Sequence, residues 1–183
     1  MGRRTVVSLL FLVLLLDGCT ADSTVTPGGG AMQLTSTAFT EGNMIPSRHG
    51  CDGDDLSPAL AWSGAPAATK AYALIMDDPD APVGVWVHWV LFNLAPDVTA
   101  LPEGVPPDPA PPTGGLHGTN SGRRIGYGGP CPPSGTHRYF FKLYALDAPL
   151  TSLSNSATAR DVVAAMRGHI LAEAQLMGRY ARR

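Results

Sequence analysis

Acidic side chains cluster in one short turn that directly follows an apolar run. Asp77, Asp78 and Asp80 lie in the segment Asp-Asp-Pro-Asp-Ala-Pro, after the apolar run that ends at Met76. Each proline fixes its own φ and keeps the preceding residue out of the helical region, so the carboxylates are displayed at the end of an extended strand. A turn of this composition is often purely structural, and its chemistry therefore depends on what lies near it.

Two histidines and a tyrosine supply groups that could share a ligand with these carboxylates. His88 interrupts an otherwise apolar run, where a neutral imidazole leaves one donor and one acceptor to be satisfied. His137 and Tyr139 are two residues apart in a strand-like run and therefore project from the same face. Imidazole and hydroxyl groups donate to phosphate oxygens, and a carboxylate can orient an imidazole. With Asp78 and Asp80 they could hold a small anion, whereas a histidine such as His88, taken alone, is usually a hydrogen-bonded core residue.

The segment 114–135 is rich in glycine, so its backbone can approach a ligand closely. The segment lacks the Gly-Lys-Ser/Thr ending of a nucleotide-binding P-loop, and the sequence has no Gly-x-Ser-x-Gly or His-Glu-x-x-His motif. The acidic run 52–55 lacks the glutamate that would complete a calcium loop. Neither Cys51 nor Cys131 has a partner at zinc-ligand spacing. The sequence therefore predicts no catalytic residue, no metal and no cofactor.

Residues 1–18 are typical of an export signal. Arg3 and Arg4 precede the apolar run 6–16, which is shorter than the roughly 20 residues needed to span a bilayer. The next four residues, Leu-Asp-Gly-Cys, are similar to a bacterial lipoprotein cleavage box and predict lipidation of Cys19 and attachment to a membrane of the cell envelope. Asp17 stands where a small or apolar residue is usual, so plain secretion with cleavage near Ala21 is the alternative.

The composition predicts one mostly β domain behind a flexible tether. Residues 19–31 have no apolar period, and the folded domain is expected over residues 32–183. The 21 glycines and 17 prolines form about a fifth of the 183 residues, which favours short strands and turns over a helical bundle. The net charge of −2 offers no basic surface for nucleic acid.

Cys51 and Cys131 remain once Cys19 carries lipid or leaves with the signal. An even number of cysteines in an exported protein predicts a disulfide, with two buried free thiols as the alternative.

Strand-like runs occur at 33–39, 59–62, 71–76, 85–94 and 137–146. The run 85–94 is apolar on both faces and is expected to be covered on both sides, whereas the proline-rich segment 95–115 predicts a long surface loop. Residues 158–161 resemble a helix capping box. Apolar residues then continue at helical spacing, which predicts a helix that Gly168 divides into two: Val162, Val163, Met166, Ile170, Leu171, Ala174 and Met177.

Several short motifs occur together in a fixed order along the chain. They are Cys51-Asp52-Gly53, Leu56-Ser57-Pro58 and Leu60-Ala61-Trp62; Asp78-Pro79-Asp80-Ala81-Pro82; Trp86-Val87-His88-Trp89; Gly126-Tyr127-Gly128-Gly129-Pro130-Cys131-Pro132-Pro133; and His137-Arg138-Tyr139. In this order they resemble the phosphatidylethanolamine-binding proteins, in particular the bacterial Raf-kinase-inhibitor-like branch, over about residues 33–180.

The resemblance implies an antiparallel β-sandwich with a few peripheral and C-terminal helices. It also implies a small pocket for phosphate, sulfate or a phosphorylated headgroup. The residues that match the family's pocket are Asp78, Asp80, His88, Pro132, Pro133, His137 and Tyr139. Eukaryotic members add a tyrosine from a C-terminal helix, for which Tyr180 is the candidate here, and the spacing does not establish that role.

Three functions are compatible with these features. The first is a non-catalytic envelope protein that binds a small phosphorylated or anionic ligand. The second is an inhibitor or interaction protein acting on a kinase, a protease or another envelope protein, since members of the family include kinase-binding proteins and protease inhibitors. The third is a weak hydrolase, for which the sequence shows no nucleophile.

Overall fold

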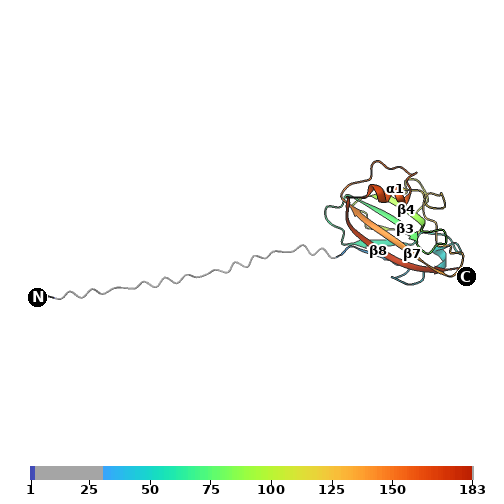
Figure 1. The fold of residues 1–183 in the computed structure, drawn as a ribbon, viewed down its shortest axis with the longest axis horizontal. Coiled ribbons are helices and arrows are strands. Elements are labelled where there is room, and N and C mark those ends of the chain that lie inside the picture. The colour runs from blue at the N-terminus through green and yellow to red at the C-terminus, as the bar shows by residue number, and fades with distance from the viewer. Residues whose placement is uncertain (3–30, 183) are drawn as a thin grey trace.

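The computed structural model describes residues 1–2 and 31–182 (Figure 1). All but the first two residues of the predicted signal peptide, the lipidation site Cys19 and all but the end of the predicted tether lie outside these residues. Among the residues that are described, no helix combines the length and the apolar character needed to cross a membrane.

Two antiparallel sheets form the domain, with strand orders β1-β2-β5 and β6-β4-β3-β7-β8. The strands are β1 (Gln33–Ser36), β2 (Leu60–Ser63), β3 (Ala71–Asp78), β4 (Trp86–Leu94), β5 (Ala100–Leu101), β6 (Leu116–His117), β7 (Thr136–Leu146) and β8 (Ile170–Ala181). The helical elements are a 3-10 turn, η1 (Ser47–His49), and α1 (Ala159–Ala165). The mostly β sandwich predicted from the sequence is therefore confirmed.

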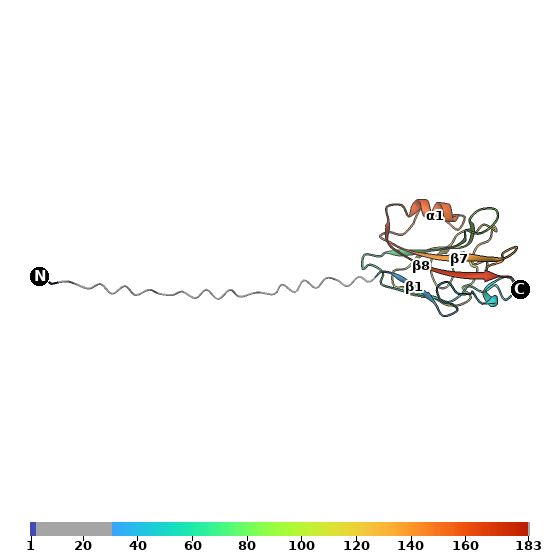
Figure 2. The same cartoon turned by 60° about the horizontal axis from the view of Figure 1, so that its bottom comes forward.

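The five-stranded sheet is buried on both faces, with β1 on one side and α1 on the other (Figure 2). One apolar cluster fills the space between the sheets, where Trp62 of the small sheet meets residues such as Met76 and Phe141 of the large one. A second cluster lies under α1, where Val162 contacts the opposite face. All eight residues of β3 are buried, and β4 is covered on both faces as its apolar pattern predicts.

The C-terminal segment corrects one sequence prediction. Only the first of the two predicted helices forms, and its capping box joins Thr158 and Asp161 as expected. After Gly168, which turns the chain at φ 82°, residues 170–181 form strand β8. Alternate residues of β8, among them Leu176 and Tyr180, point into the core.

The error has a physical cause. The segment is rich in Ala, Leu, Glu, Gln and Met, which all favour helices in isolation. Pairing along nearly the whole of β7 overrides that preference, because the edge of β7 would otherwise leave its backbone groups without partners. Ile170 and Leu171, which belonged to the expected apolar face of the helix, are 44% and 38% exposed.

The predicted disulfide is present. Cys51 and Cys131 are bonded with their Cα atoms 5.4 Å apart, and the bond closes a loop with a sequence separation of 80 residues. It ties the loop after η1 to the glycine-rich segment that precedes β7.

Replacing both cysteines, as Cys51→Ser with Cys131→Ser, should lower the free energy of unfolding by up to about 4.5 kcal/mol, because the unfolded chain regains the freedom that the closed loop removes. Urea unfolding of the wild type with reductant should give the midpoint of the double variant. Equal wild-type midpoints with and without reductant would contradict the contribution assigned to the bond.

Candidate functional site

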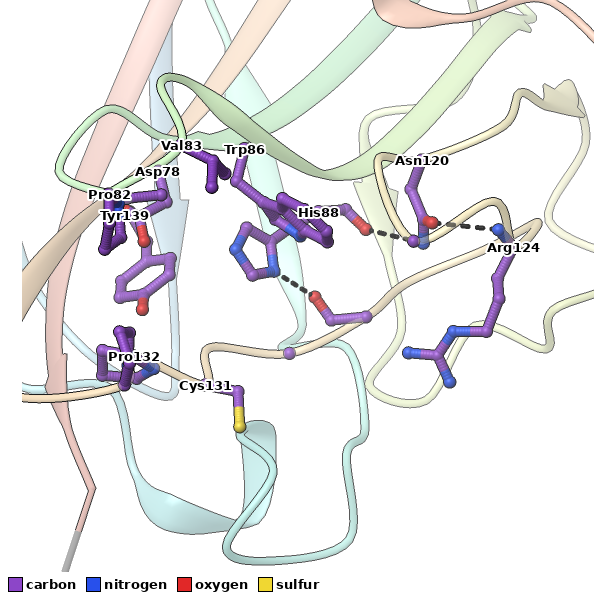
Figure 3. Close-up of a pocket in the computed structure, with 15 residues that line it drawn as sticks. Asp78, Pro82, Val83, Trp86, His88, Asn120, Arg124, Cys131, Pro132 and Tyr139 are labelled. Carbon is purple, nitrogen blue, oxygen red and sulfur yellow. Dashed lines mark hydrogen bonds between the residues drawn. The ribbon is translucent and has the colours of Figure 1, made fainter.

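A cavity of about 320 Å³ opens at the ends of the three inner strands of the large sheet, β4, β3 and β7 (Figure 3). Because the strands are antiparallel, β3 ends where β4 and β7 begin: Asp78 pairs with Trp86, and Asp77 pairs with Phe140. Asp78 of β3, His88 of β4 and Tyr139 of β7 therefore reach one cavity from distant parts of the chain. The loops 81–83 and 120–133 supply the rest of its lining.

A β-bulge sets the position of His88. Trp89 pairs with Met76 and Val87 pairs with Asp77, so His88 is an extra residue between two consecutive pairs. The carbonyl of His88 instead accepts two hydrogen bonds, from the backbone N–H of Gly128 at 3.0 Å and from the side-chain amide of Asn120 at 3.4 Å. Bulges change the direction of the side chain that they carry and are frequent beside functional sites.

The ring of His88 is held in one tautomer. Its Nδ1 lies 2.7 Å from the carbonyl oxygen of Gly128, which can only accept, so Nδ1 carries the proton and donates. The neutral ring therefore leaves Nε2 as an acceptor, on the side of the ring that faces Tyr139 in Figure 3. Burial lowers the pKa of His88 below 6.5, although the Gly128 hydrogen bond and the charge of Asp78 oppose this shift.

The Asp78 carboxylate is buried and firmly oriented. Its Oδ1 accepts the backbone N–H of Asp80 at 2.8 Å, and its Oδ2 accepts Nδ1 of His137 at 2.7 Å. These two bonds fix the carboxylate on the cavity wall and use only part of its capacity to accept.

Tyr139 supplies a hydrogen-bond donor at the inner end of the cavity, the part lined by Asp78, His88 and Tyr139. The hydroxyl is buried, and no described residue meets both the distance and the angle of a hydrogen bond with it, although the Asp78 carboxylate lies nearby. Its ring meets the His88 ring edge-on, with centroids 5.2 Å apart. Burial, and next the negative charge of Asp78, raise the pKa of Tyr139 well above 10, so the hydroxyl keeps its proton. An unpaired buried donor beside a cavity calls for a ligand or water that accepts from it.

Of the seven residues predicted for the pocket, the structure brings five to the cavity lining: Asp78, His88, Pro132, Pro133 and Tyr139.

The other two predicted residues, Asp80 and His137, are not part of the lining. His137 lies behind Asp78 and orients it. Asp80 accepts the Nε and Nη2 groups of Arg138 at 2.9 and 2.7 Å and also its backbone N–H at 3.0 Å. The side-chain hydrogen bonds of Arg138 are the main reason that the pKa of Asp80 falls to about 2.

Tyr180, the C-terminal tyrosine considered for the pocket, is bonded to Asp52. It is buried, it pairs with His137 across the sheet, and its hydroxyl donates to the Asp52 carboxylate at 3.0 Å. Tyr180 is not among the residues that line the cavity.

The glycine-rich segment is held against the site from outside. The backbone N–H of Gly129 donates to Asp55 Oδ1 at 2.6 Å, and the disulfide fixes Cys131, which lines the cavity. A side chain at position 129 would collide with the His49 carbonyl and with Asp55. Only glycine therefore allows this close approach.

Sequence reasoning did not assign the other ten lining residues to the site, among them three with aromatic or polar side chains: Trp86, Asn120 and Arg124. Asn120 is buried and bonds the loop to the carbonyl of His88 at 3.4 Å. Arg124 is one of two adjacent arginines, and the sequence gives no signal that separates it from Arg123. The described residues contain no group of three His, Cys, Asp or Glu side chains that could hold a metal ion.

A two-layer β-sandwich with a small cavity at the ends of three neighbouring inner strands of its larger sheet defines the class of protein. A family model described as phosphatidylethanolamine-binding protein matches residues 35–181. The chain belongs to this family.

Relatives of known sequence or structure match most of the chain. A protein of Methanothermobacter thermautotrophicus named UPF0098 protein is 53% identical over 151 residues, which are 82% of this chain and 99% of that protein. The crystal structure of CT736 from Chlamydia trachomatis, described as a homologue of the family, has a TM-score of 0.76 and 42% identity and covers 84% of this chain and 99% of its own. E. coli YbcL has a TM-score of 0.78 and 32% identity and covers 84% of this chain and 100% of its own.

The geometry of His88 predicts its titration. NMR of the imidazole nitrogens should show a neutral ring with the proton on Nδ1 and a pKa below 6.5, because burial disfavours the charged ring and the Gly128 carbonyl fixes the proton. A neutral His88 protonated on Nε2, or a pKa above 6.5, would contradict this description of the site.

Proposed function

We propose that this protein binds a small phosphorylated or otherwise anionic ligand in the cavity, without a covalent step, and does so at the cell envelope. The observation that carries the proposal is the buried Tyr139 hydroxyl, which keeps its proton and meets both the distance and the angle of a hydrogen bond with no described residue. An oxyanion is the ligand class that accepts such a donor most strongly. Location at the envelope, with Cys19 as the lipid anchor, is supported by the export-signal features of residues 1–19.

The inner end of the cavity favours an oxyanion that still carries a proton. Neutral His88 offers an acceptor, and Asp78 offers the unused lone pairs of a carboxylate. A fully deprotonated anion would be repelled by Asp78, whereas the O–H group of a hydrogen phosphate can donate to either acceptor while another oxygen accepts from Tyr139. Phosphate and phosphate monoesters, whose second pKa lies near neutrality, fit this pattern.

The proposal is limited to binding because of the groups that line the cavity. Within the described part of the chain, the one cysteine of the lining, Cys131, is held in the disulfide and has no free thiol. The lining contains no serine, threonine or lysine. Asp78 and His88 have the chemistry of proton carriers, but no nucleophile stands beside them.

A second function, recognition of another protein, is favoured by the mouth of the cavity. Val83 and Trp86 line the cavity, follow the acidic turn and are 79% and 36% exposed. Exposed apolar side chains gathered at a cavity mouth are typical of a contact surface. In this case the cavity would receive a side chain of the partner.

The variant Tyr139→Phe tests the proposed ligand class. It removes one hydroxyl and should weaken phosphate binding by about tenfold or more, since a hydrogen bond to a charged group contributes roughly 1.5–3 kcal/mol. Calorimetry measures the effect, and Tyr144→Phe, on the same strand but outside the cavity, is the matched control.

The same titrations between pH 8 and pH 5 should show wild-type affinity rising as the pH falls. Protonation of His88 converts Nε2 from an acceptor into a charged donor, and its lowered pKa places this gain below pH 6.5. If the wild type binds no phosphate at any pH, or if Tyr139→Phe binds it equally well, the proposal is wrong and recognition of a partner protein becomes the leading function.

A further inference from the structure

Arg124 lines the same cavity as Asp78 and carries the opposite charge. Among the described residues that line the cavity, it is the one with a full positive charge. Its side chain is exposed, and no carboxylate of the described residues lies within ion-pair distance of it. This holds although Asp54 and Asp55 border the adjoining hollow that Arg124 also lines. The guanidinium is therefore available to a ligand.

The backbone that carries Arg124 is fixed to the strand that carries His88. The Asn120 side chain accepts the backbone N–H of Arg124 at 3.0 Å, and the backbone N–H of Asn120 donates to the Arg124 carbonyl at 2.9 Å. Ser121 then exchanges two hydrogen bonds with Val87, each of 2.9 Å. The turn is thus bonded to β4 beside His88, which fixes the backbone of Arg124 next to the cavity.

The guanidinium and the His88 ring approach the same backbone residue. A Cβ atom placed on Gly128 would lie 3.2 Å from Nη2 of Arg124, and the Gly128 carbonyl accepts the proton of His88. Any side chain at position 128 would press against the guanidinium. The labelled side chains of Figure 3 run from Tyr139 and Asp78, past His88, to Arg124.

We propose that Arg124 makes the cavity selective for phosphate monoesters that carry a second anionic group, such as a carboxylate. This inference rests on the proposed function and adds the ligand class to it. The phosphate occupies the inner end at Tyr139, His88 and Asp78, and the second group is bound by the guanidinium. An arginine suits this task because its planar N–H groups match a carboxylate in two parallel hydrogen bonds. A ligand whose second group is an ammonium meets repulsion at the same place.

Three probes separate the two ends of the cavity. Inorganic phosphate fills the inner end alone, phosphoglycolate adds a carboxylate, and phosphoethanolamine adds an ammonium group. Wild-type protein in calorimetry at about 0.15 M salt should bind phosphoglycolate about tenfold more tightly than phosphoethanolamine, a value at the low end for charged pairs because Arg124 is exposed.

Arg124→Gln is expected to remove this preference and to leave the affinity for inorganic phosphate much less changed. Arg123→Gln is the matched control: it removes the same charge from the adjacent exposed residue, which does not line the cavity, and should keep the preference. Equal thermal unfolding of the two variants verifies that both are folded.

The outcomes distinguish the two proposals. If the wild type binds none of the three probes, the proposed function fails and this inference fails with it. If the wild type binds phosphate but shows no preference, or if Arg124→Gln keeps the preference, the role of Arg124 is overturned while the phosphate site stands. A loss of preference in Arg123→Gln as large as in Arg124→Gln would show a general charge effect and would also overturn it.

Discussion

The antiparallel pairing of β3 with both β4 and β7 is the constraint on which the site depends. Strand β3 is buried along its whole length, so its register against both neighbours is fixed by the core on its two faces. That register places the end of β3 beside the beginnings of β4 and β7. A shift of one residue in either pairing would turn His88 or Tyr139 to the opposite face of the sheet and dismantle the cavity.

The polar groups of the site are arranged by a second set of constraints, in which each group limits the freedom of the next. The bulge turns His88 toward the cavity, and Gly128 fixes its tautomer. His137 orients Asp78, whose charge in turn helps to keep the proton on Tyr139. The site therefore presents two acceptors and one donor at its inner end before any ligand arrives. Such preorganisation lowers the entropy that binding must overcome.

The walls of the cavity are held in place in part by residues that do not line it. Asp80 contributes indirectly. Its pairing with Arg138 ties the acidic turn after β3 to the beginning of β7, so the turn that forms one wall is anchored to the strand that carries Tyr139.

The sequence predicted what local pattern and composition determine. The apolar runs gave β3, β4 and β7 nearly to the residue, and the even number of cysteines gave the disulfide. The position of Arg124 depends on a long-range contact between a loop and β4, and the bulge at His88 depends on the register with β3. Neither the position of Arg124 nor the bulge at His88 produces a periodic pattern in the sequence.

Strand β8 escaped prediction for the opposite reason, because its local pattern is informative but misleading. The residues of β8 favour a helix in isolation. They alternate between core and solvent because β8 is paired with β7 as a strand. The matched family motifs brought Asp80 and His137 into the pocket set, whereas the folded chain uses them to hold its walls.

A crystal structure of the protein grown with phosphate at pH 6 tests the central claim most directly. The account predicts tetrahedral density inside the cavity with one oxygen within hydrogen-bond distance of Tyr139 Oη. Density for phosphate only on the outer surface, or a cavity filled by the protein's own side chains, would contradict it.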